Sequence, residues 1–431
     1  MQNSSSGTIR AALRYPAFRR LLAALAVSQV GDWLYNLALA VVVYDRTHSP
    51  LWIGATTAAR VVPFVVLGPL GGVLADRFDR RRVMIASDAI RMALMLLLAV
   101  VAAAGLPILL APVIAALATV ASVPYLPCVS AVIPRLVRDE DLPGANAARS
   151  ATTGLGVVAG PALGGILLLL GSPAIAIAVN ALTFGLSALA VLAIGNRDAF
   201  RAVRSADPPA GLLREVARGA AALRAHPAAL RLVGADITCS VVYGAQTVLL
   251  LLVSRQVGLG TQGYGYLFAG IGAGGLVGTA LTSRASRSAH PRRILAGALA
   301  IVGLPMLLLA VTRWPAAAIF LAGLTGAGAL LVEILTDTCL QRVVDDDVLG
   351  RAYGLALPAS VGGIAAGALI APVLAQSLGG SGALAAVGSA VMAYALVVLY
   401  QNRAARNDSG PTGTYDHSFV RAADVERERN P

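Results

Sequence analysis

The sequence predicts an all-α membrane protein whose twelve transmembrane helices form two parallel six-helix repeats. Three observations carry this prediction. The first is composition, because 57% of the 431 residues are hydrophobic and only 13% are charged, and apolar stretches of about twenty residues, each long enough to cross a bilayer, recur along the chain. The second is the placement of the basic residues, and the third is an internal repeat.

The apolar stretches are continuous rather than alternating, so helices and not barrel strands are expected to cross the membrane. Breaks at Gly, Pro and charged clusters divide the first half into spans near 18–44, 52–75, 83–104, 107–133, 147–170 and 173–195. The second half divides into spans near 231–254, 263–283, 294–312, 314–337, 352–376 and 382–401. The expected domains are an N-terminal half (1–195), a cytoplasmic linker (196–230), a C-terminal half (231–403) and a disordered cytoplasmic tail (404–431).

Every one of the 34 basic residues is Arg, because the chain contains no Lys. A Walker-type phosphate loop and Schiff-base chemistry both need Lys, so any transport must draw its energy from a gradient or a partner. If both termini are cytoplasmic, the Arg clusters all lie on the cytoplasmic side of a plasma membrane. These clusters fall within 10–20, 77–82, 284–293 and the central linker. This topology accounts for the formal charge of +12 without nucleic acid.

Neither a metal nor a cofactor is expected. The three cysteines have no close Cys or His neighbour in the sequence, which supports neither a disulfide framework nor a zinc site. The four histidines, His48, His226, His290 and His417, fall outside the predicted spans. A membrane-embedded metalloenzyme is therefore disfavoured, and the chain is not expected to be an enzyme.

The two halves repeat one another. The segment that begins at Tyr15 matches the one that begins at His226, 211 residues later, and the segment that begins at Arg135 matches the one at Arg342, 207 residues later. At the second offset, Gly71 falls on Gly278, Gly156 on Gly363 and Gly160 on Gly367. Such a match requires two six-span halves of the same orientation in the membrane.

The loop after the second span carries a recognisable motif. It reads Gly71-Gly72-Val73-Leu74-Ala75-Asp76-Arg77-Phe78-Asp79-Arg80-Arg81-Arg82. With the six-plus-six repeat, it resembles the signature G-x-L-A-D-R-x-G-R-R of the major facilitator superfamily, although Asp79 replaces the usual Gly. An Asp at a helix end can pair with Arg and hold the transporter closed in one conformational state. The alternative is that these charges serve only to orient the helices in the membrane. The candidate latch residues are Gly72, Asp76, Arg77, Arg80 and Arg81.

A second motif lies in the fifth span, where Gly156, Gly160, Pro161 and Gly164 resemble the G-x-x-x-G-P-x-x-G-G motif of the superfamily's antiporters. Glycines four residues apart allow close helix approach, and Pro161 removes a backbone donor. Helix packing alone explains the glycines almost as well.

Two further segments resemble the drug and siderophore exporter branch of the superfamily, which contains macrolide-efflux and enterobactin-exporter-like proteins. These are the segments Ser28-Gln29-Val30-Gly31-Asp32-Trp33 and Ala59-Arg60-Val61-Val62-Pro63. The Arg that many drug exporters carry in the fourth span is missing, since no Arg lies between Leu106 and Pro134. A proton relay that depends on that Arg must be altered here.

Charges within the spans indicate the mechanism, because each costs about 2.5–3.5 kcal/mol to insert and so needs a partner or a wet cavity. Asp32 and Arg60 are predicted to pair. The resemblance to the superfamily implies that Asp236 and Glu333 line the cavity from the other half, and interfacial charges at helix ends are the alternative for them. Asp88 and Arg91, three residues apart on the third span, are predicted to form a structural pair. Uncharged side chains on cavity helices can contact cargo or merely pack; they are Trp33, Tyr35, Asn36, Tyr125, Tyr243 and Gln246.

These observations favour a monomeric, proton-coupled exporter of an amphipathic small molecule, such as a drug, an antibiotic or a siderophore, which works by alternating access. A cationic cargo would suit Asp32, and an anionic one would suit Arg60. A lysophospholipid flippase or an uptake carrier is the alternative within transport. A non-transporting sensor or assembly partner is the alternative from another class, but the 196–230 linker is too short for a folded domain.

Overall fold

The computed structural model describes residues 8–170, 172–201, 227–261, 263–285, 291–343 and 346–407. Every regular element within these ranges is a helix, which confirms the all-α prediction. Most of the predicted linker, from 202 to 226, and the predicted tail from 408 onward lie outside the described residues.

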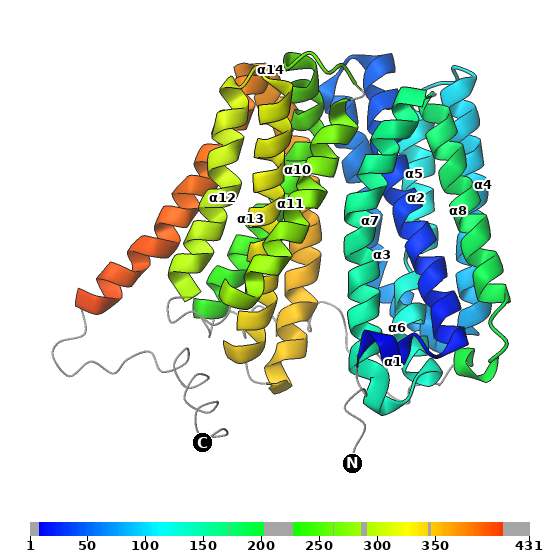
Figure 1. Ribbon diagram of the computed structural model, residues 1–431. Coiled ribbons are helices and arrows are strands. Elements are labelled where there is room, and N and C mark those ends of the chain that lie inside the picture. The colour runs from blue at the N-terminus through cyan, green and yellow to red at the C-terminus, as the bar shows by residue number, and fades with distance from the viewer. Residues whose placement is uncertain are drawn as a thin grey trace. The chain divides into compact units, whose positions relative to one another are not determined.

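The first half of the chain builds the helices drawn from blue to green in Figure 1. Their bounds are α1 Ile9–Ala12, α2 Pro16–Thr47, α3 Pro50–Arg77, α4 Arg80–Ala103, α5 Leu110–Ser122, α6 Tyr125–Leu136, α7 Leu142–Leu170 and α8 Pro173–Leu192, with short 3-10 turns η1 Asp139–Asp141 and η2 Asp198–Phe200. The helices of the second half are α10 Pro227–Gln256, α11 Gly263–Ala285, α12 Pro291–Val311, α13 Pro315–Val343 and α14 Asp346–Asn407.

The membrane-spanning helices match the predicted spans. Among the described residues, nine stretches are long and apolar enough to cross a membrane, and α5 with α6 forms one of them. Another, Pro358–Tyr400, contains two predicted spans, because Gly379 interrupts α14 with a φ of 73°. That left-handed conformation is one that glycine adopts without steric cost. Helices α7 and α11 occupy the remaining predicted spans, so the described helices account for twelve.

Proline sets the start of many of these helices. Its fixed φ suits the first helical position, where the missing N–H would have no partner in any case. Six helices begin in this way, at Pro16, Pro50, Pro173, Pro227, Pro291 and Pro315. Helix α4 instead begins after Asp79, whose carboxylate accepts a hydrogen bond from the backbone N–H of Arg82 at 2.9 Å. The Asp that departs from the superfamily signature is therefore an N-cap, and its φ of −58° needs no Gly.

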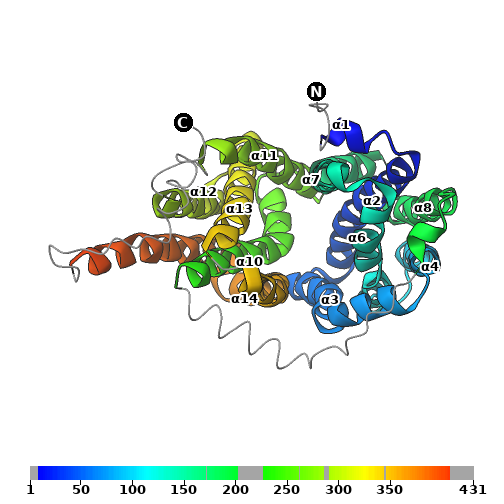
Figure 2. The same cartoon turned by 90° about the horizontal axis from the view of Figure 1, so that it is seen from below.

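Helix α2 is the centre of the first half and packs against both α7 and α8 (Figures 1 and 2). The fifth-span glycines make the α7 contact. A Cβ on Gly156 would lie 2.9 Å from Cβ of Gln29, one on Gly160 would lie 2.2 Å from Cβ of Trp33, and one on Gly164 would lie 2.8 Å from Leu37. The glycines and their partners both recur every four residues, so the motif is an α2–α7 packing face.

The second half repeats this contact. A Cβ on Gly363 of α14 would lie 3.3 Å from Cβ of Ser240 of α10, and one on Gly367 would lie 2.0 Å from the carbonyl oxygen of Val241. Gly363 and Gly367 are the positions that the sequence repeat aligns with Gly156 and Gly160. Equivalent glycines thus serve equivalent helix pairs in the two halves.

We predict that Gly160→Ala destabilises the protein by about 1–3 kcal/mol, because the new methyl group has to push α7 away from Trp33. The measurement is thermal unfolding of the purified protein in detergent. Gly297→Ala on α12 is the matched control, since nothing lies within 4 Å of its Cβ position and removing a helix glycine stabilises by about 0.4–1 kcal/mol. Equal stability of the two variants would contradict the packing assignment.

By contacts, the chain divides into two compact units. One contains Met1–Pro208 with Leu250–Gly272, and the other contains Pro209–Leu249 with Ala273–Pro431. The polar cluster around Asp32 lies in the first unit, and the carboxylates Asp236 and Glu333 lie in the second.

Candidate functional site

A polar face runs along the middle of α2. Ser28, Asp32, Tyr35 and Asn36 lie at intervals of four, three and one residues, which places them on one side of the helix. The Asp32 side chain is 39% exposed, whereas Ser28 and Tyr35 are buried. The Ser28 hydroxyl, the Tyr35 hydroxyl and the Asn36 side-chain oxygen are buried atoms without a hydrogen-bond partner among the described residues. A membrane span rarely leaves such groups unsatisfied unless a ligand or water meets them.

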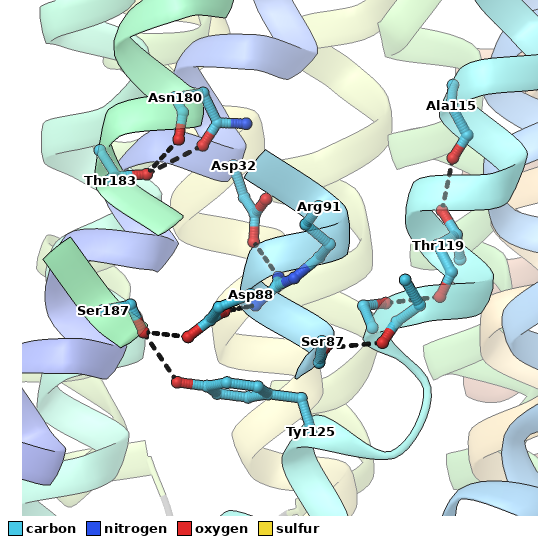
Figure 3. Close-up of polar contacts among 12 residues, drawn as sticks. Asp32, Ser87, Asp88, Arg91, Ala115, Thr119, Tyr125, Asn180, Thr183 and Ser187 are labelled. Atoms are coloured by element: carbon cyan, nitrogen blue, oxygen red, sulfur yellow. Dashed lines mark hydrogen bonds and ion pairs between the residues drawn. The ribbon is translucent and has the colours of Figure 1, made fainter. Parts of the chain in front are cut away.

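Arg91 of α4 joins two carboxylates, as Figure 3 shows. Its Nη2 lies 2.5 Å from Oδ1 of Asp88, and its Nη1 lies 3.7 Å from Oδ2 of Asp32. Asp88 is wholly buried, with 0% of its side chain exposed, and Arg91 is 7% exposed. The predicted Asp88–Arg91 pair is therefore confirmed, and its guanidinium also reaches the accessible carboxylate of Asp32.

Neighbouring helices hold this pair in position. The Ser187 hydroxyl of α8 donates to Oδ2 of Asp88 at 2.6 Å, so the Tyr125 hydroxyl, 3.0 Å away, must donate to Ser187. The Arg91 guanidinium lies over the Phe184 ring at 4.0 Å and over the Tyr125 ring at 5.0 Å. One charge-assisted hydrogen bond to Asp88, a longer ion pair to Asp32 and two cation–π contacts thus hold Arg91 in place.

The structure corrects the predicted Asp32–Arg60 ion pair. The guanidinium within 4.0 Å of Asp32 is that of Arg91, and Arg60 acts on Asp32 only as a more distant charge. Counting residues along straight helices gives the depth of each charge in the membrane but not its direction around the helix axis. Depth alone could therefore not show that α4 rather than α3 supplies the partner.

Arg60 instead lies over the aromatic ring of Tyr35, 5.0 Å from the ring centroid. It is half-buried and lies on the packed face of α3, two turns after Ile53 and three turns before Gly71, both of which are buried. The guanidinium therefore points toward α2 and the bundle interior. Among the described residues, it forms neither an ion pair nor a hydrogen bond.

The uncharged candidates separate into two groups. Tyr125 and Gln246 are buried. Tyr125 belongs to the Asp88 network, and the Gln246 amide lies 3.7 Å from the Met306 sulfur. Both side chains therefore serve to pack the helices. Trp33, Asn36 and Tyr243 are half-buried. Trp33 also forms the surface against which Gly160 packs.

The second unit carries its own carboxylates. The Ser360 hydroxyl of α14 donates to Oδ2 of Asp236 on α10, and Asp236 is half-buried. Glu333 on α13 is exposed, and its electrostatic neighbours are the like-charged Asp236 and Asp337. The two predicted cavity carboxylates of this half are thus close enough to repel each other.

The candidate latch forms a compact local arrangement. Arg80 is buried, with its Nε donating to the Ala75 carbonyl at 3.0 Å and its Nη2 lying 3.4 Å from Oδ1 of Asp76. Arg81 donates to the Leu192 carbonyl at the end of α8. Arg77 is exposed, and nothing lies within 4 Å of a Cβ on Gly72. In this structure, the motif ties the start of α4 to the end of α3 and to the end of α8.

Sequence reasoning assigned Arg91 a structural role and overlooked Ser187 and Phe184 as its supports. A signal existed in part, because a lone hydroxyl in an apolar span needs a partner. No pattern within α8 by itself indicates that Ser187 and Phe184, one turn apart, face the two members of the Asp88–Arg91 pair on α4.

Comparison with known proteins identifies the chain. The family model of the transmembrane secretion effectors (MFS_3) matches residues 7–431. The protein belongs to this family of major facilitator transporters. As a member of this family, the chain is a multi-pass membrane transporter and not an enzyme, which confirms the resemblance to the superfamily drawn from the loop motif.

Curated relatives of this transporter include exporters. It is 29% identical over 377 residues to the uncharacterized MFS-type transporter YfiS of Bacillus subtilis, covering 83% of this chain and 87% of YfiS. It is 27% identical over 362 residues to the putative bacilysin exporter BacE of Bacillus amyloliquefaciens, covering 80% of this chain and 86% of BacE. It is also 25% identical to macrolide efflux protein A of Streptococcus pyogenes over 57% of this chain and 60% of that protein.

Solved structures confirm the twelve-helix transporter fold. The crystal structure of the nucleoside transporter NupG matches this transporter with a TM-score of 0.72 at 12% identity, covering 90% of this chain and 99% of that chain. The peptide transporter POT matches with a TM-score of 0.71 at 13% identity, covering 90% of this chain and 94% of that chain.

Proposed function

We propose that this transporter is a proton-coupled exporter of an amphipathic small molecule, located in the plasma membrane with both termini in the cytoplasm. The observation that carries the proposal is the accessible carboxylate of Asp32, which shares the fixed guanidinium of Arg91 with Asp88. Arg91 lies 2.5 Å from Asp88 but 3.7 Å from Asp32. Asp32 is therefore held loosely enough to exchange its partner for a proton or a cationic group of the cargo.

Competition at one carboxylate is what antiport requires. A carboxylate in a membrane span is costly when charged and unpaired, so Asp32 is stabilised by a proton, by the cargo or by Arg91. If a proton and the cargo cannot occupy Asp32 together, inward movement of the proton drives outward movement of the cargo through alternating access. The efflux functions in the names of two relatives, bacilysin export and macrolide efflux, support the outward direction.

The experiment that tests the proposal is cargo accumulation in inside-out vesicles, in which an exporter moves its cargo into the acidified lumen. We expect a probe such as the dipeptide diphenylalanine to accumulate only when a proton gradient is present and to leak out when an uncoupler is added. Accumulation in right-side-out vesicles instead would favour the uptake carrier.

The same proposal includes a role for the α3–α4 loop. Asp76 is about half-exposed while its partner Arg80 is buried, so Asp76 keeps acceptor capacity for a second group. We propose that the loop, with Gly72, Asp76, Arg77, Arg80 and Arg81, is a conformational latch on the cytoplasmic side.

Topology is tested by labelling of single cysteines introduced into a variant without native cysteines. We expect Ser49→Cys and Gly260→Cys to react with a membrane-impermeant maleimide in whole cells, because both lie in loops between spans on the outer side. Ser205→Cys and Ser288→Cys are expected to react only after the membrane is opened. Labelling of position 205 in intact cells would overturn the proposed orientation.

A further inference from the structure

The unpaired guanidinium of Arg60 is the feature of the proposed transport site that nothing above explains. Arg60 sits inside span α3 on its packed face, and within the part of the chain that the structure describes no carboxylate lies within 4.0 Å of it. Asp32 does not neutralise it at close range, because the ion-pair partner of Asp32 is Arg91. A guanidinium in a membrane span without an anionic partner is costly and marks a functional site.

Tyr35 supplies a second donor at the same place. Its ring lies 5.0 Å below the Arg60 guanidinium, its side chain is only 5% exposed, and its hydroxyl has no hydrogen-bond partner among the described residues. Arg carries donors only, and a Tyr hydroxyl can donate. A planar anion such as a carboxylate satisfies both, because the guanidinium fork matches two carboxylate oxygens.

Asp32 provides the opposite charge on the adjacent helix. Its carboxylate is 39% exposed and lies within the electrostatic range of Arg60 without forming an ion pair with it. With Asp32, Asp88, Arg91 and Arg60 all ionised, the group is neutral. A cargo with one cationic and one anionic end preserves that neutrality, whereas a purely anionic cargo would require a proton to stay on Asp32 and would abolish antiport.

From this arrangement we infer that the cargo is an amphipathic zwitterion, whose ammonium group meets Asp32 and whose carboxylate meets Arg60 and the hydroxyl of Tyr35. The inference rests on the proposed function and names the charge class that its site selects. Asn36, with a buried side-chain oxygen that lacks a partner among the described residues, lies one residue beyond Tyr35 and adds an acceptor on the same helix.

A matched set of three probes tests this inference. The set consists of diphenylalanine, its C-terminal carboxamide, which lacks the anionic end, and N-acetyl-diphenylalanine, which lacks the cationic end. Affinities for the purified protein are measured by calorimetry in detergent without a gradient. We expect the wild type to bind diphenylalanine at least about tenfold more tightly than either derivative, since each charge-assisted contact contributes about 1.5–3 kcal/mol.

Two variants should then show which residue binds which end of the cargo. Arg60→Gln is expected to bind diphenylalanine and its carboxamide equally well, while still binding diphenylalanine more tightly than the N-acetyl form. Asp32→Asn is expected to bind diphenylalanine and the N-acetyl form equally well, while still binding diphenylalanine more tightly than the carboxamide. Tyr35→Phe should weaken only the carboxylate preference without loss of thermal stability, because the described residues give the hydroxyl no hydrogen-bond partner to lose. Arg313→Gln, in the exposed loop before α13, is the control and should change none of the affinities.

The outcomes separate this inference from the proposed function. If the carboxylate adds nothing to wild-type affinity, or if Arg60→Gln weakens diphenylalanine and its carboxamide equally, the zwitterion assignment is overturned. The proposed function is tested by the carboxamide alone, whose affinity should rise with pH as protons leave Asp32, up to the pH at which its own α-amino group, with a pKa of about 7.7–8.0, loses its proton. The charged or titratable groups near Asp32 are Arg91 and Asp88 of α4, Arg60 of α3, Tyr125 of α6 and Tyr35 of α2 itself, so Asp32→Asn must abolish that rise.

Discussion

Asp32→Asn is expected to abolish gradient-driven export while leaving cargo binding detectable, the largest functional loss predicted for any single substitution. The amide cannot exchange a proton, so the inward gradient has no group through which to drive the cargo. Diphenylalanine accumulation in inside-out vesicles should fall to the level seen without a gradient. In the purified wild type, binding of diphenylalanine should release protons into a lightly buffered solution, and the variant should release none.

The control for this experiment is Asp198→Asn, which removes an exposed carboxylate outside the spans and should export like the wild type. If Asp32→Asn still releases protons on binding, coupling does not reside at Asp32. Glu333, the exposed carboxylate beside Asp236 in the second unit, is then the next candidate, and Glu333→Gln the next variant.

Arg91→Met is expected to cause the largest loss of stability, about 3–5 kcal/mol, because it leaves the wholly buried carboxylate of Asp88 without its cation. The double variant Asp88→Asn with Arg91→Met should recover most of that loss, since the uncompensated charge is gone and Asn still accepts the Ser187 hydrogen bond. Unfolding in detergent mixtures, followed by tryptophan fluorescence, measures both.

The exposed pair Asp198 and Arg201 offers a matched comparison, because it has the same three-residue spacing but both side chains are 79% exposed. Arg201→Met should leave the unfolding curve unchanged, as is usual for surface ion pairs. If Arg91→Met is as stable as Arg201→Met, the network is not what holds α2, α4 and α8 together, and Arg91 is free to move during transport.

The sequence by itself determined the architecture, because in lipid the physics of the backbone leaves few choices. Apolar stretches of about twenty residues must be helices that satisfy their own hydrogen bonds, and the Arg asymmetry and the repeat restrict how they are arranged. The predicted break between the last two spans contains Gly379, where the helix is interrupted. The fifth-span glycines were predicted to allow close helix approach, and the structure shows that their partner is α2.

The spacing within α4 predicted the Asp88–Arg91 pair, but which charges meet between helices depends on the tertiary packing. Asp32, Asp88 and Arg91 were recognisable as costly groups, but a period of 3.6 residues and a rise of 1.5 Å fix only height and angle on each helix. They do not fix how each helix is rotated against its neighbours. That rotation, set by packing of α4 against α8 and of α2 against α7 and α8, turned Arg91 toward Asp32. It left Arg60 over Tyr35 with no carboxylate of the described residues within 4.0 Å, because side chains in a close-packed bundle are oriented by contacts that no single helix encodes.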